Sequence, residues 1–563
     1  MPSSTGFGLR WSRPLSNIYR DEFERVARRA FSMWNRDPAS PSFGSFDRQY
    51  WGWKYKDFGD ATLQYSVRLA ADYANTRAAP TLLSVLLEGF VAHCAKIQRR
   101  DGSFDQCYPY ERTPGVVLDI LSTLIYVRQS PHLTSCHARI RLDEAIDRAA
   151  AYAVRTDEAH GAIANHFAQY AYELFNYASY SGDPAAKAKA QQYLSRLLDL
   201  FDPDEGWFQE YDGPDAGYQT RTLRYLVKIA SLNEGPELWS VAERAARFVE
   251  VVLMPDGSVH PMLGSRATAL LYPSGFEILA LRDSRHGPLA ARVRQAWQDS
   301  RVPLPSVLDF SSAIRLADDA REAAIAAGPG AEKTTMAAPD SLLDADLPKA
   351  GIAIRKNGRR ACYVGYRLGG VVVAYTRSGD GAWRLAVEDS GYLLQSATGD
   401  ERWLTRMPGS GTLQAADARR FKIEAHFFRS LHEELSPWRL IALRLLNLTL
   451  LRAQRVGDLF RKLVVSRLMA KREPVPVRLR RVVTVGETGI EIVDRVTAGP
   501  DTPASAMSGR LYRCRRVTGI HMASARYFQE QEFVPADPGW VEEVAWQGGA
   551  AEPTNIRIDA TGD

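Results

Sequence analysis

Apolar residues recur every three or four positions through most of the first 330 residues, which is the period of an amphipathic helix. Alanine, leucine and arginine dominate these stretches, and Gly or Pro separates them. The pattern predicts helices over residues 60–78, 80–98, 114–129, 138–155, 163–181, 184–201, 216–232, 237–253 and 275–298.

From residue 349 onward, short β-branched and aromatic runs alternate with turn residues, a pattern that is typical of an antiparallel β-sandwich. The runs are GIAIRK, ACYVGYRL, GVVVAYTR, GYLLQSA, RFKIEAHFF, LRRVVTVG and IEIVDRVTA. Residues 331–348 are small and polar and are interrupted by Pro, as in an interdomain linker. We therefore expect one domain over residues 1–330 and a second over residues 349–563.

A turn motif repeats in the helical half as FGSFDRQYWGW, DGSFDQCYPY, HGAIANHFAQY, DEGWFQEYDG and DGSVHPMLGSR. The steps between its glycines are 58, 59, 45 and 51 residues, and each fits one helical hairpin. The marker glycines are Gly44, Gly102, Gly161, Gly206 and Gly257. Hairpins packed around an axis form an (α/α) toroid (an incomplete barrel), and the polar residues after each glycine would then meet at one rim. Alternatively, these glycines only end helices.

The segment 437–472 interrupts the strand pattern with a helical, basic stretch in which nine Lys and Arg residues stand against a single acid, Asp458. One hypothesis is a helix that lies on an anionic membrane surface and gives peripheral membrane contact. The other is that its apolar face packs on the toroid while the arginines are solvated.

Composition and short motifs argue against several classes of binding site. The net charge of +5 is small for 563 residues and suits an anionic ligand only where the charge clusters. Neither GxxxxGK nor a strand-borne GxGxxG occurs, so we expect no nucleotide site and no nucleic-acid partner. Five scattered cysteines without metal spacing predict free thiols, and we expect no metal and no other cofactor.

The first 16 residues lack the apolar core of a secretion signal, which predicts a cytoplasmic protein that is membrane-associated if the basic segment binds lipid.

The third and fourth repeats carry the residues that fit acid–base chemistry on a sugar. Asn165 and His166 begin one predicted helix, and Tyr218 begins another after Glu210 and Tyr211. In β-elimination of a uronate, the carboxylate is neutralised, a base removes the C5 proton and an acid protonates the departing O4 oxygen. Amides and imidazoles can bind a carboxylate, while Tyr or His can carry the proton.

These residues and the two-domain layout resemble the heparinase II/III and alginate-lyase-like family of polysaccharide lyases, which joins an (α/α) toroid to a β-sandwich. In that family an Asn or His after a helix turn neutralises the uronate, and a Tyr a little over fifty residues later carries the proton. The resemblance implies these roles for Asn165 and His166 and for Tyr218, which follows them by 53 and 52 residues. The context DEGWFQEYDGPDAGY also looks like the family's. An acidic polysaccharide or oligosaccharide is the implied partner.

Further residues are expected to support this site. Glu210, Tyr211, His260 and Arg266 would surround it, with Arg266 able to bind a carboxylate bidentately. The family often carries a histidine-rich patch early in the β-domain, and the comparable stretch here, SGDGAWRLAVEDSG, contains no histidine. His260 could substitute for it from the toroid. Trp51, Trp53 and Lys54 in the first repeat predict a sugar subsite, or alternatively packing between the first helices.

Three other functions remain open from the sequence. A uronate C5-epimerase would use the same proton abstraction. An inverting glycoside hydrolase would use a pair of acids, for which Asp47, Asp57, Asp105 and Glu111 are available. A polysaccharide-binding factor in capsule or exopolysaccharide biosynthesis would need no proton carrier at all.

Overall fold

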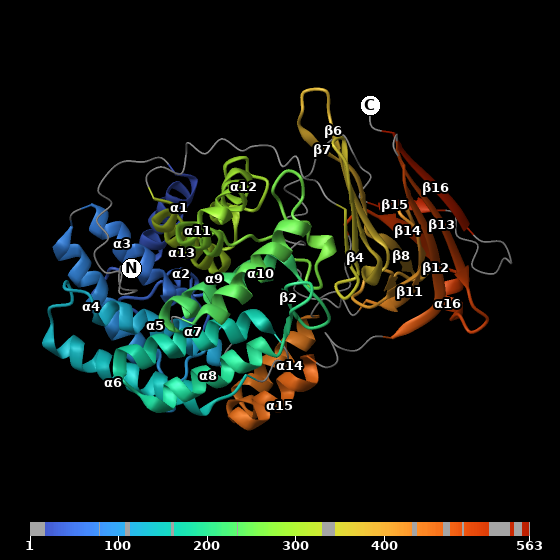
Figure 1. Cartoon of the computed structure of the whole chain (residues 1–563). Coiled ribbons are helices and arrows are strands. Elements are labelled where there is room, and N and C mark those ends of the chain that lie inside the picture. Colours follow the sequence, from blue (N-terminus) through green and yellow to red (C-terminus); the bar gives the residue numbers. More distant parts are fainter. Residues whose placement is uncertain are drawn as a thin grey trace.

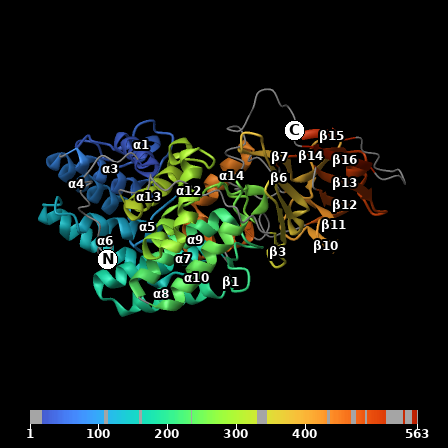
Figure 2. The ribbon, with the colours of Figure 1, turned by 45° about the horizontal axis from the view of Figure 1, so that its top comes forward.

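The structure is a computed structural model of the 563-residue chain. It describes residues 17–77, 79–106, 113–158, 163–233, 235–328, 344–430, 436–465, 473–486, 489–516, 541–544 and 554–561. Helices form the first half and antiparallel sheets the second, and the two halves lie side by side (Figures 1 and 2). The expected fold class, an (α/α) toroid followed by an antiparallel β-sandwich, is confirmed.

The toroid has an inner ring of helices, each packed on the next, with the last packed back on the first. In order, the ring contains α1 (Ile18–Met33), α3 (Ser66–Thr76), α5 (Pro114–Arg128), α7 (Ala164–Ser181), α9 (Ala216–Asn233), α11 (Ser274–Arg282) and α13 (Phe310–Ala327). The outer layer contains α4 (Pro80–Ile97), α6 (Cys136–Arg155), α8 (Pro184–Leu198), α10 (Pro236–Val252) and α12 (Gly287–Gln298). Burial separates the layers: α5 buries twelve of its 15 residues, whereas α8 buries four of 15. A short helix, α2 (Arg48–Trp51), follows α1.

The repeated glycines fix the turns against the outer helices. Each described one has a φ between +81° and +90°, which favours glycine. A Cβ added there would lie 1.8–2.9 Å from a backbone oxygen of α4, α6, α10 or α12. The pairs are Gly44 with Gly89, Gly102 with Arg148, Gly206 with Arg244 and Gly257 with Arg292. Gly161 lies outside the described residues. The repeat therefore reflects one contact that recurs around the toroid.

The C-terminal half contains two sheets. The first is a meander of β3 (Ala345–Leu347), β4 (Ile352–Lys356), β5 (Arg360–Gly365), β6 (Val371–Arg377) and β7 (Trp383–Asp389). The second has the order β15-β14-β8-β9-β11-β12-β13-β16, with β10 paired to β11. Its strands are β8 (Gly391–Gln395), β9 (Arg402–Leu404), β10 (Gly411–Ala416), β11 (Arg420–Arg429), β12 (Pro474–Val485), β13 (Gly489–Ala498), β14 (Arg510–Cys514), β15 (Val541–Val544) and β16 (Thr554–Thr561).

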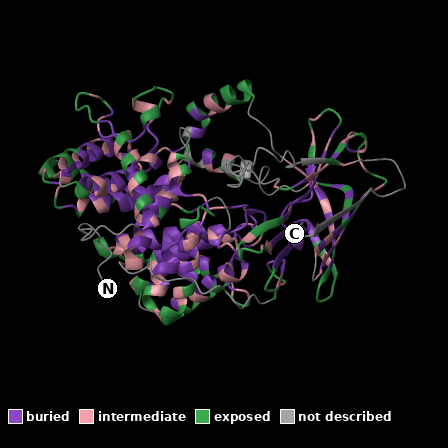
Figure 3. Cartoon of the chain, turned by 90° about the horizontal axis from the view of Figure 1, so that it is seen from above, coloured by how far each residue is buried: buried purple, intermediate pink, exposed green. Residues whose placement is uncertain are grey.

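The first sheet is buried on both faces, and this attaches the sandwich to the toroid. Val372 and Ala374 of β6 pack toward the second sheet, whereas Val371, Val373 and Tyr375 belong to the same apolar core as the toroid helices. This alternation follows from the two-residue period of a strand. Figure 3 shows the buried residues, in purple, through the middle of the toroid and along the adjoining strands. The two halves therefore share a continuous core.

Some elements differ from the predicted ones. Helices α1 and α13 were not among the predicted segments, and the segment 275–298 is two helices, α11 and α12, separated at Ser284–His286. Strand β3 lies inside the stretch expected as linker, most of which is outside the described residues. The four described cysteines, Cys94, Cys136, Cys362 and Cys514, are free.

Among the described residues, one helix, α4, is long and apolar enough to cross a membrane. It packs on α3 and α6 and buries Leu86, Leu87 and Phe90. We interpret α4 as an outer helix of the toroid that buries one apolar face.

Candidate functional site

Asn165 and Glu210 join the start of α7 to the turn before α9. Ile163, just before the helix, forms an isolated antiparallel bridge with Glu210. The Glu210 carboxylate then accepts hydrogen bonds from the Asn165 backbone N–H (2.8 Å) and from its side-chain amide (2.9 and 3.0 Å). Both residues are buried, at about 1% exposure each. The Asn165 amide oxygen has no hydrogen-bond partner among the described residues.

Glu210 is a titratable group at the centre of this arrangement. Burial raises the pKa of Glu210 to about 7, and the hydrogen bonds from Asn165 and the charge of Arg266 oppose that rise only in part. A carboxyl group with such a pKa exchanges its proton near neutral pH. Perturbed acids of this kind are concentrated at functional sites, although buried structural networks also produce them.

His166, next in sequence, lies beside a second buried acid. Its Nδ1 is 3.3 Å from Oε2 of Glu158, and the Tyr170 hydroxyl donates to the same oxygen. A carboxylate at Nδ1 favours the tautomer that carries its proton there, which orients the ring. His166 is partly exposed, whereas Glu158 is buried. The imidazole is therefore partly accessible from solvent, whereas its carboxylate partner is buried.

Arg266 brings a positive charge to two tyrosines. Its guanidinium carbon lies 4.5 Å from the ring centroid of Tyr211 and 5.8 Å from that of Tyr218. All three side chains are partly exposed. Burial raises the pKa of Tyr211 to about 12 despite the opposing charge of Arg266. The three side chains form a partly exposed surface of two phenols and one cation.

The Asp215 carboxylate fixes the backbone beneath this surface by accepting three hydrogen bonds. Its Oδ1 accepts from the Tyr218 backbone N–H (3.0 Å), and its Oδ2 accepts from the backbone N–H groups of Arg266 (3.0 Å) and Thr268 (3.3 Å). The Ser265 hydroxyl donates to the carbonyl oxygen of Glu210 at 2.9 Å. One buried carboxylate therefore positions the backbone of both Tyr218 and Arg266.

The backbone is strained beside these residues. Tyr211 has φ of 60° and Ala267, which follows Arg266, has φ of 52°. Non-glycine residues rarely adopt this region, and such strain clusters at functional sites. The described chain contains two other such residues, Lys54 and Ser300.

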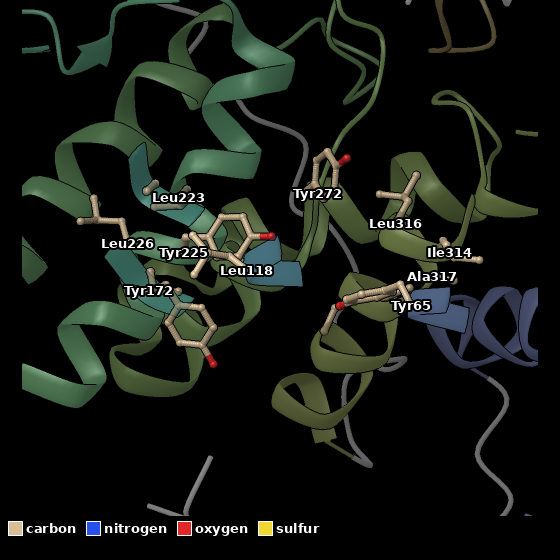
Figure 4. Close-up of a cluster of buried hydrophobic side chains, with 14 of the residues drawn as sticks. Tyr65, Leu118, Tyr172, Leu223, Tyr225, Leu226, Tyr272, Ile314, Leu316 and Ala317 are labelled. Atoms are coloured by element: carbon tan, nitrogen blue, oxygen red, sulfur yellow. The ribbon is translucent and has the colours of Figure 1, made fainter. Parts of the chain in front are cut away.

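Below the site, polar groups link the inner helices. Arg221 of α9 donates to Gln169 of α7 (2.8 Å), and Gln169 donates to Asp119 of α5 (2.8 Å). Asp119 also accepts two hydrogen bonds from Arg315 of α13. Deeper in the toroid the rings of Tyr172 and Tyr225 lie 5.9 Å apart within the buried cluster that Figure 4 shows. These contacts hold α7 and α9, which carry the site, in a fixed relation.

His260 lies at the junction of the two halves. Its Nε2 is 2.8 Å from Oε1 of Glu388 on β7, and Arg516 donates to the same oxygen. Burial would raise the pKa of Glu388, but the hydrogen bond and charge of His260 and the charge of Arg516 hold that pKa at about 2. His260 and Arg516 also line a cleft of about 680 Å³ between toroid loops and the β6–β7 hairpin, together with Tyr375 and Trp383. His260 therefore binds an acid of the sandwich.

The first-repeat residues lie on α2 and the turn after it. The Trp51 indole donates to the carbonyl oxygen of Met33 at 3.0 Å, whereas Trp53 is 56% exposed and its ring is tilted against that of Tyr55. Lys54 is exposed and has φ of 61°. Within the described residues, no hydrogen bond, ion pair or ring contact links these side chains to Tyr218, so the structure does not bring the two groups together through direct contacts.

The acids considered for hydrolysis are engaged in other contacts. Asp47 is buried and pairs with Lys56, Asp105 forms a two-point pair with Arg99, and Asp57 pairs with Arg444. Glu111 lies outside the described residues. Among the described His, Cys, Asp and Glu residues, no group of three or more could hold a metal ion.

The structure brings together five of the predicted residues, Asn165, Glu210, Tyr211, Tyr218 and Arg266, and His166 follows Asn165 at the start of α7. It adds Glu158, Asp215 and Glu388, which the sequence analysis did not select. Glu158 and Asp215 are within eight residues of a predicted site residue, but nothing in their spacing indicates a contact. Glu388 lies 128 residues from its partner His260.

Comparisons with known proteins gave similarity only at the level of structure. No family model matches the chain, and no curated protein matches it. One similar solved structure is the Streptomyces coelicolor chondroitin AC lyase in complex with chondroitin sulphate, at 12% identity and a TM-score of 0.47, over 88% of this chain and 67% of that one. Another is heparinase III, at 10% identity and a TM-score of 0.47, over 90% of this chain and 74% of that one. A family 76 glycoside hydrolase from Bacteroides thetaiotaomicron matches at 10% identity and a TM-score of 0.38, over 55% of this chain and 78% of that one. At such identities and scores, the function has to be inferred from this chain's own side chains.

Proposed function

We propose that this protein is a lyase that cleaves a uronate-containing polysaccharide by β-elimination. The observation that carries the proposal is that Arg266 lies over the ring of Tyr218 while its charge acts on Glu210, the buried acid that holds Asn165 next to His166 at the start of α7. A cation, an imidazole and a phenol, each partly exposed, match the needs of proton abstraction next to a carboxylate.

Each side chain would have a defined task. His166 and Arg266 would bind the sugar carboxylate, which makes the C5 proton more acidic. One amide N–H of Asn165 can point between the two Glu210 oxygens, and its second N–H would then support the carboxylate. Tyr218 would carry the proton: the C5–H bond breaks, the C4–C5 double bond forms, and the C4–O4 bond breaks as O4 receives a proton.

Glu210 and Glu158 would act as positioning residues, because each is buried and holds a side chain of the site. Trp51, Trp53, Lys54 and His260 would bind more distant sugar units. The partner would be an acidic polysaccharide or oligosaccharide, since the charged side chain over the ring of the proton carrier is the cation Arg266.

The direct test is the ultraviolet absorbance of the unsaturated uronate over a panel of acidic polysaccharides, bacterial exopolysaccharides included. Wild-type protein should produce the chromophore, and Tyr218→Phe should lower kcat by roughly 10²- to 10⁴-fold. Tyr180→Phe, at an exposed position near the end of α7, is the matched control and should leave the rate unchanged.

Other outcomes would favour other functions. Deuterium incorporation at C5 without the chromophore would identify a C5-epimerase. New reducing ends without unsaturated products would identify a glycoside hydrolase. Binding without turnover, unaffected by Tyr218→Phe, would indicate a non-catalytic polysaccharide-binding factor.

A further inference from the structure

The basic segment forms a helical insertion where the fold needs only a turn. Strands β11 and β12 pair directly, with Phe428 opposite Pro474 and the Arg429 N–H donating to the Glu473 carbonyl oxygen at 2.9 Å. A short loop suffices to join two such strands. Instead residues 430–473 carry α14 (Pro437–Leu448) and α15 (Gln454–Val465), which lie on the toroid side of the molecule (Figures 1 and 2). The insertion is therefore much longer than the connection between the two strands requires.

Both helices of the insertion expose an apolar face. Exposed apolar side chains recur every three or four residues on both helices. Those with this period are Trp438, Ile441, Leu445 and Leu448 on α14 and Val456, Leu459 and Leu463 on α15, and Leu440 and Leu450 are exposed as well. Of the 20 large apolar side chains exposed in the described chain, nine lie between residues 438 and 463. Packing of this face on the toroid, one of the two hypotheses from the sequence, does not occur for these side chains.

An ion pair beside this apolar face links the insertion to the toroid. Arg444 of α14 pairs with Asp57 at 2.7 Å, in the loop that follows α2. That loop also exposes Trp53 and Tyr55, whose rings lie 5.7 Å apart, and Trp438 is 79% exposed at the start of α14. Tryptophan and tyrosine favour the boundary between lipid and water. Aromatic side chains are therefore exposed both on this loop and on α14.

Charge decides which partner suits this face. Residues 437–472 carry nine basic residues and one acid, and Arg439 and Lys462 are exposed. Two copies that met through this face would bring like charges together. An anionic lipid surface would satisfy both the apolar side chains and the positive charge.

We propose that the α14–α15 insertion docks the protein on an anionic lipid bilayer, with the apolar faces of both helices in the headgroup region. The toroid would then work on polysaccharide held at a membrane. That consequence rests on the proposed function, whereas the docking itself does not.

The test is co-sedimentation of the full chain with vesicles of phosphatidylglycerol and phosphatidylcholine, and with vesicles of phosphatidylcholine alone. Wild-type protein should bind the anionic vesicles, less so as salt is raised, and bind neutral vesicles weakly. The triple variant Ile441→Ser, Leu445→Ser, Leu459→Ser should lower the partition coefficient at least about tenfold. Because these side chains are exposed, its melting temperature should match that of the wild type.

The matched control is Leu82→Ser, Ile140→Ser, Leu281→Ser, which removes three exposed apolar side chains from other parts of the toroid and should bind like the wild type. Wild-type protein that stays in solution with anionic vesicles at low salt would overturn the proposal, as would equal loss of binding in the control. Sedimentation velocity without lipid adds one more outcome: a dimer that the insertion variant alone dissociates would assign the face to a second copy. None of these results depends on lyase activity.

Discussion

The carboxylate of Glu210 accepts hydrogen bonds from both the backbone N–H and the amide of Asn165, so one buried acid connects the start of α7 with the turn before α9. Glu388 makes the comparable connection between the toroid and the sandwich through His260. At Glu210 burial outweighs the hydrogen bonds that oppose it, whereas at Glu388 the hydrogen bonds and charges of His260 and Arg516 together outweigh burial. The pKa shifts of the two acids have opposite signs, and so should their effects on stability.

Glu210 should make the protein less stable as the pH rises from about 4.5 to about 7. The folded chain keeps this proton up to a pKa of about 7, and the unfolded chain releases it near 4.5, so ionisation penalises the folded state. The penalty above pH 7 is on the order of 3 kcal/mol. Glu210→Gln should therefore gain stability relative to the wild type over this interval in unfolding measured at a series of pH values. Glu144→Gln, at an exposed position of α6, should run parallel to the wild type, and parallel curves for Glu210→Gln would refute the assignment.

Glu388 should act in the opposite direction. Its pKa of about 2 lies below the ordinary 4.5, so its contribution is present above pH 4.5 and is lost as the pH falls toward 2. Glu388→Gln should lower the melting temperature at neutral pH, and the difference from the wild type should shrink in acid. A difference that stays constant down to pH 3 would show that the carboxylate charge is not the cause.

Arg266→Lys should weaken catalysis although it keeps the charge. Lysine cannot lie flat over the Tyr211 ring and bind a carboxylate in two-point geometry at once. Loss of one charged hydrogen bond lowers kcat/KM roughly 10- to 100-fold. Arg285→Lys, in an exposed pair with Asp283, is the control and should retain full activity.

Gly102→Ala should destabilise the toroid more than Gly182→Ala does. Both glycines have positive φ, which costs a side chain about 1–2 kcal/mol. Only at Gly102 would the new Cβ also collide with the Arg148 carbonyl oxygen, at 1.9 Å, since nothing lies within 4 Å at Gly182. Chemical denaturation should separate the variants by an additional 1–3 kcal/mol, roughly the cost of overpacking. Equal losses would show that the turn does not pack tightly on α6.

Periodicity predicted most elements because the outer helices and the strands each bury one face or alternate faces. It missed α1 and α13 and merged α11 with α12. The merged pair is split because the Asp283 side chain caps the next turn and Gly287-Pro288 begins a new helix. The repeat of marker glycines was readable because the same backbone contact, which admits no Cβ, occurs at each of the four described glycines.

The sequence by itself determined the fold class, the hairpin repeat and the positions of Asn165, His166 and Tyr218 at helix starts, because these depend on local periodicity and turn chemistry. Only the tertiary structure decided that Glu210 holds Asn165, that Asp215 holds both Tyr218 and Arg266, and that Glu388 meets His260. Such pairs are set by how helices and sheets pack, over separations of 45 to 128 residues in the first and last cases. The same holds for the α14–α15 insertion: its apolar pattern was visible in the chain, but its exposure depended on where the flanking strands placed it.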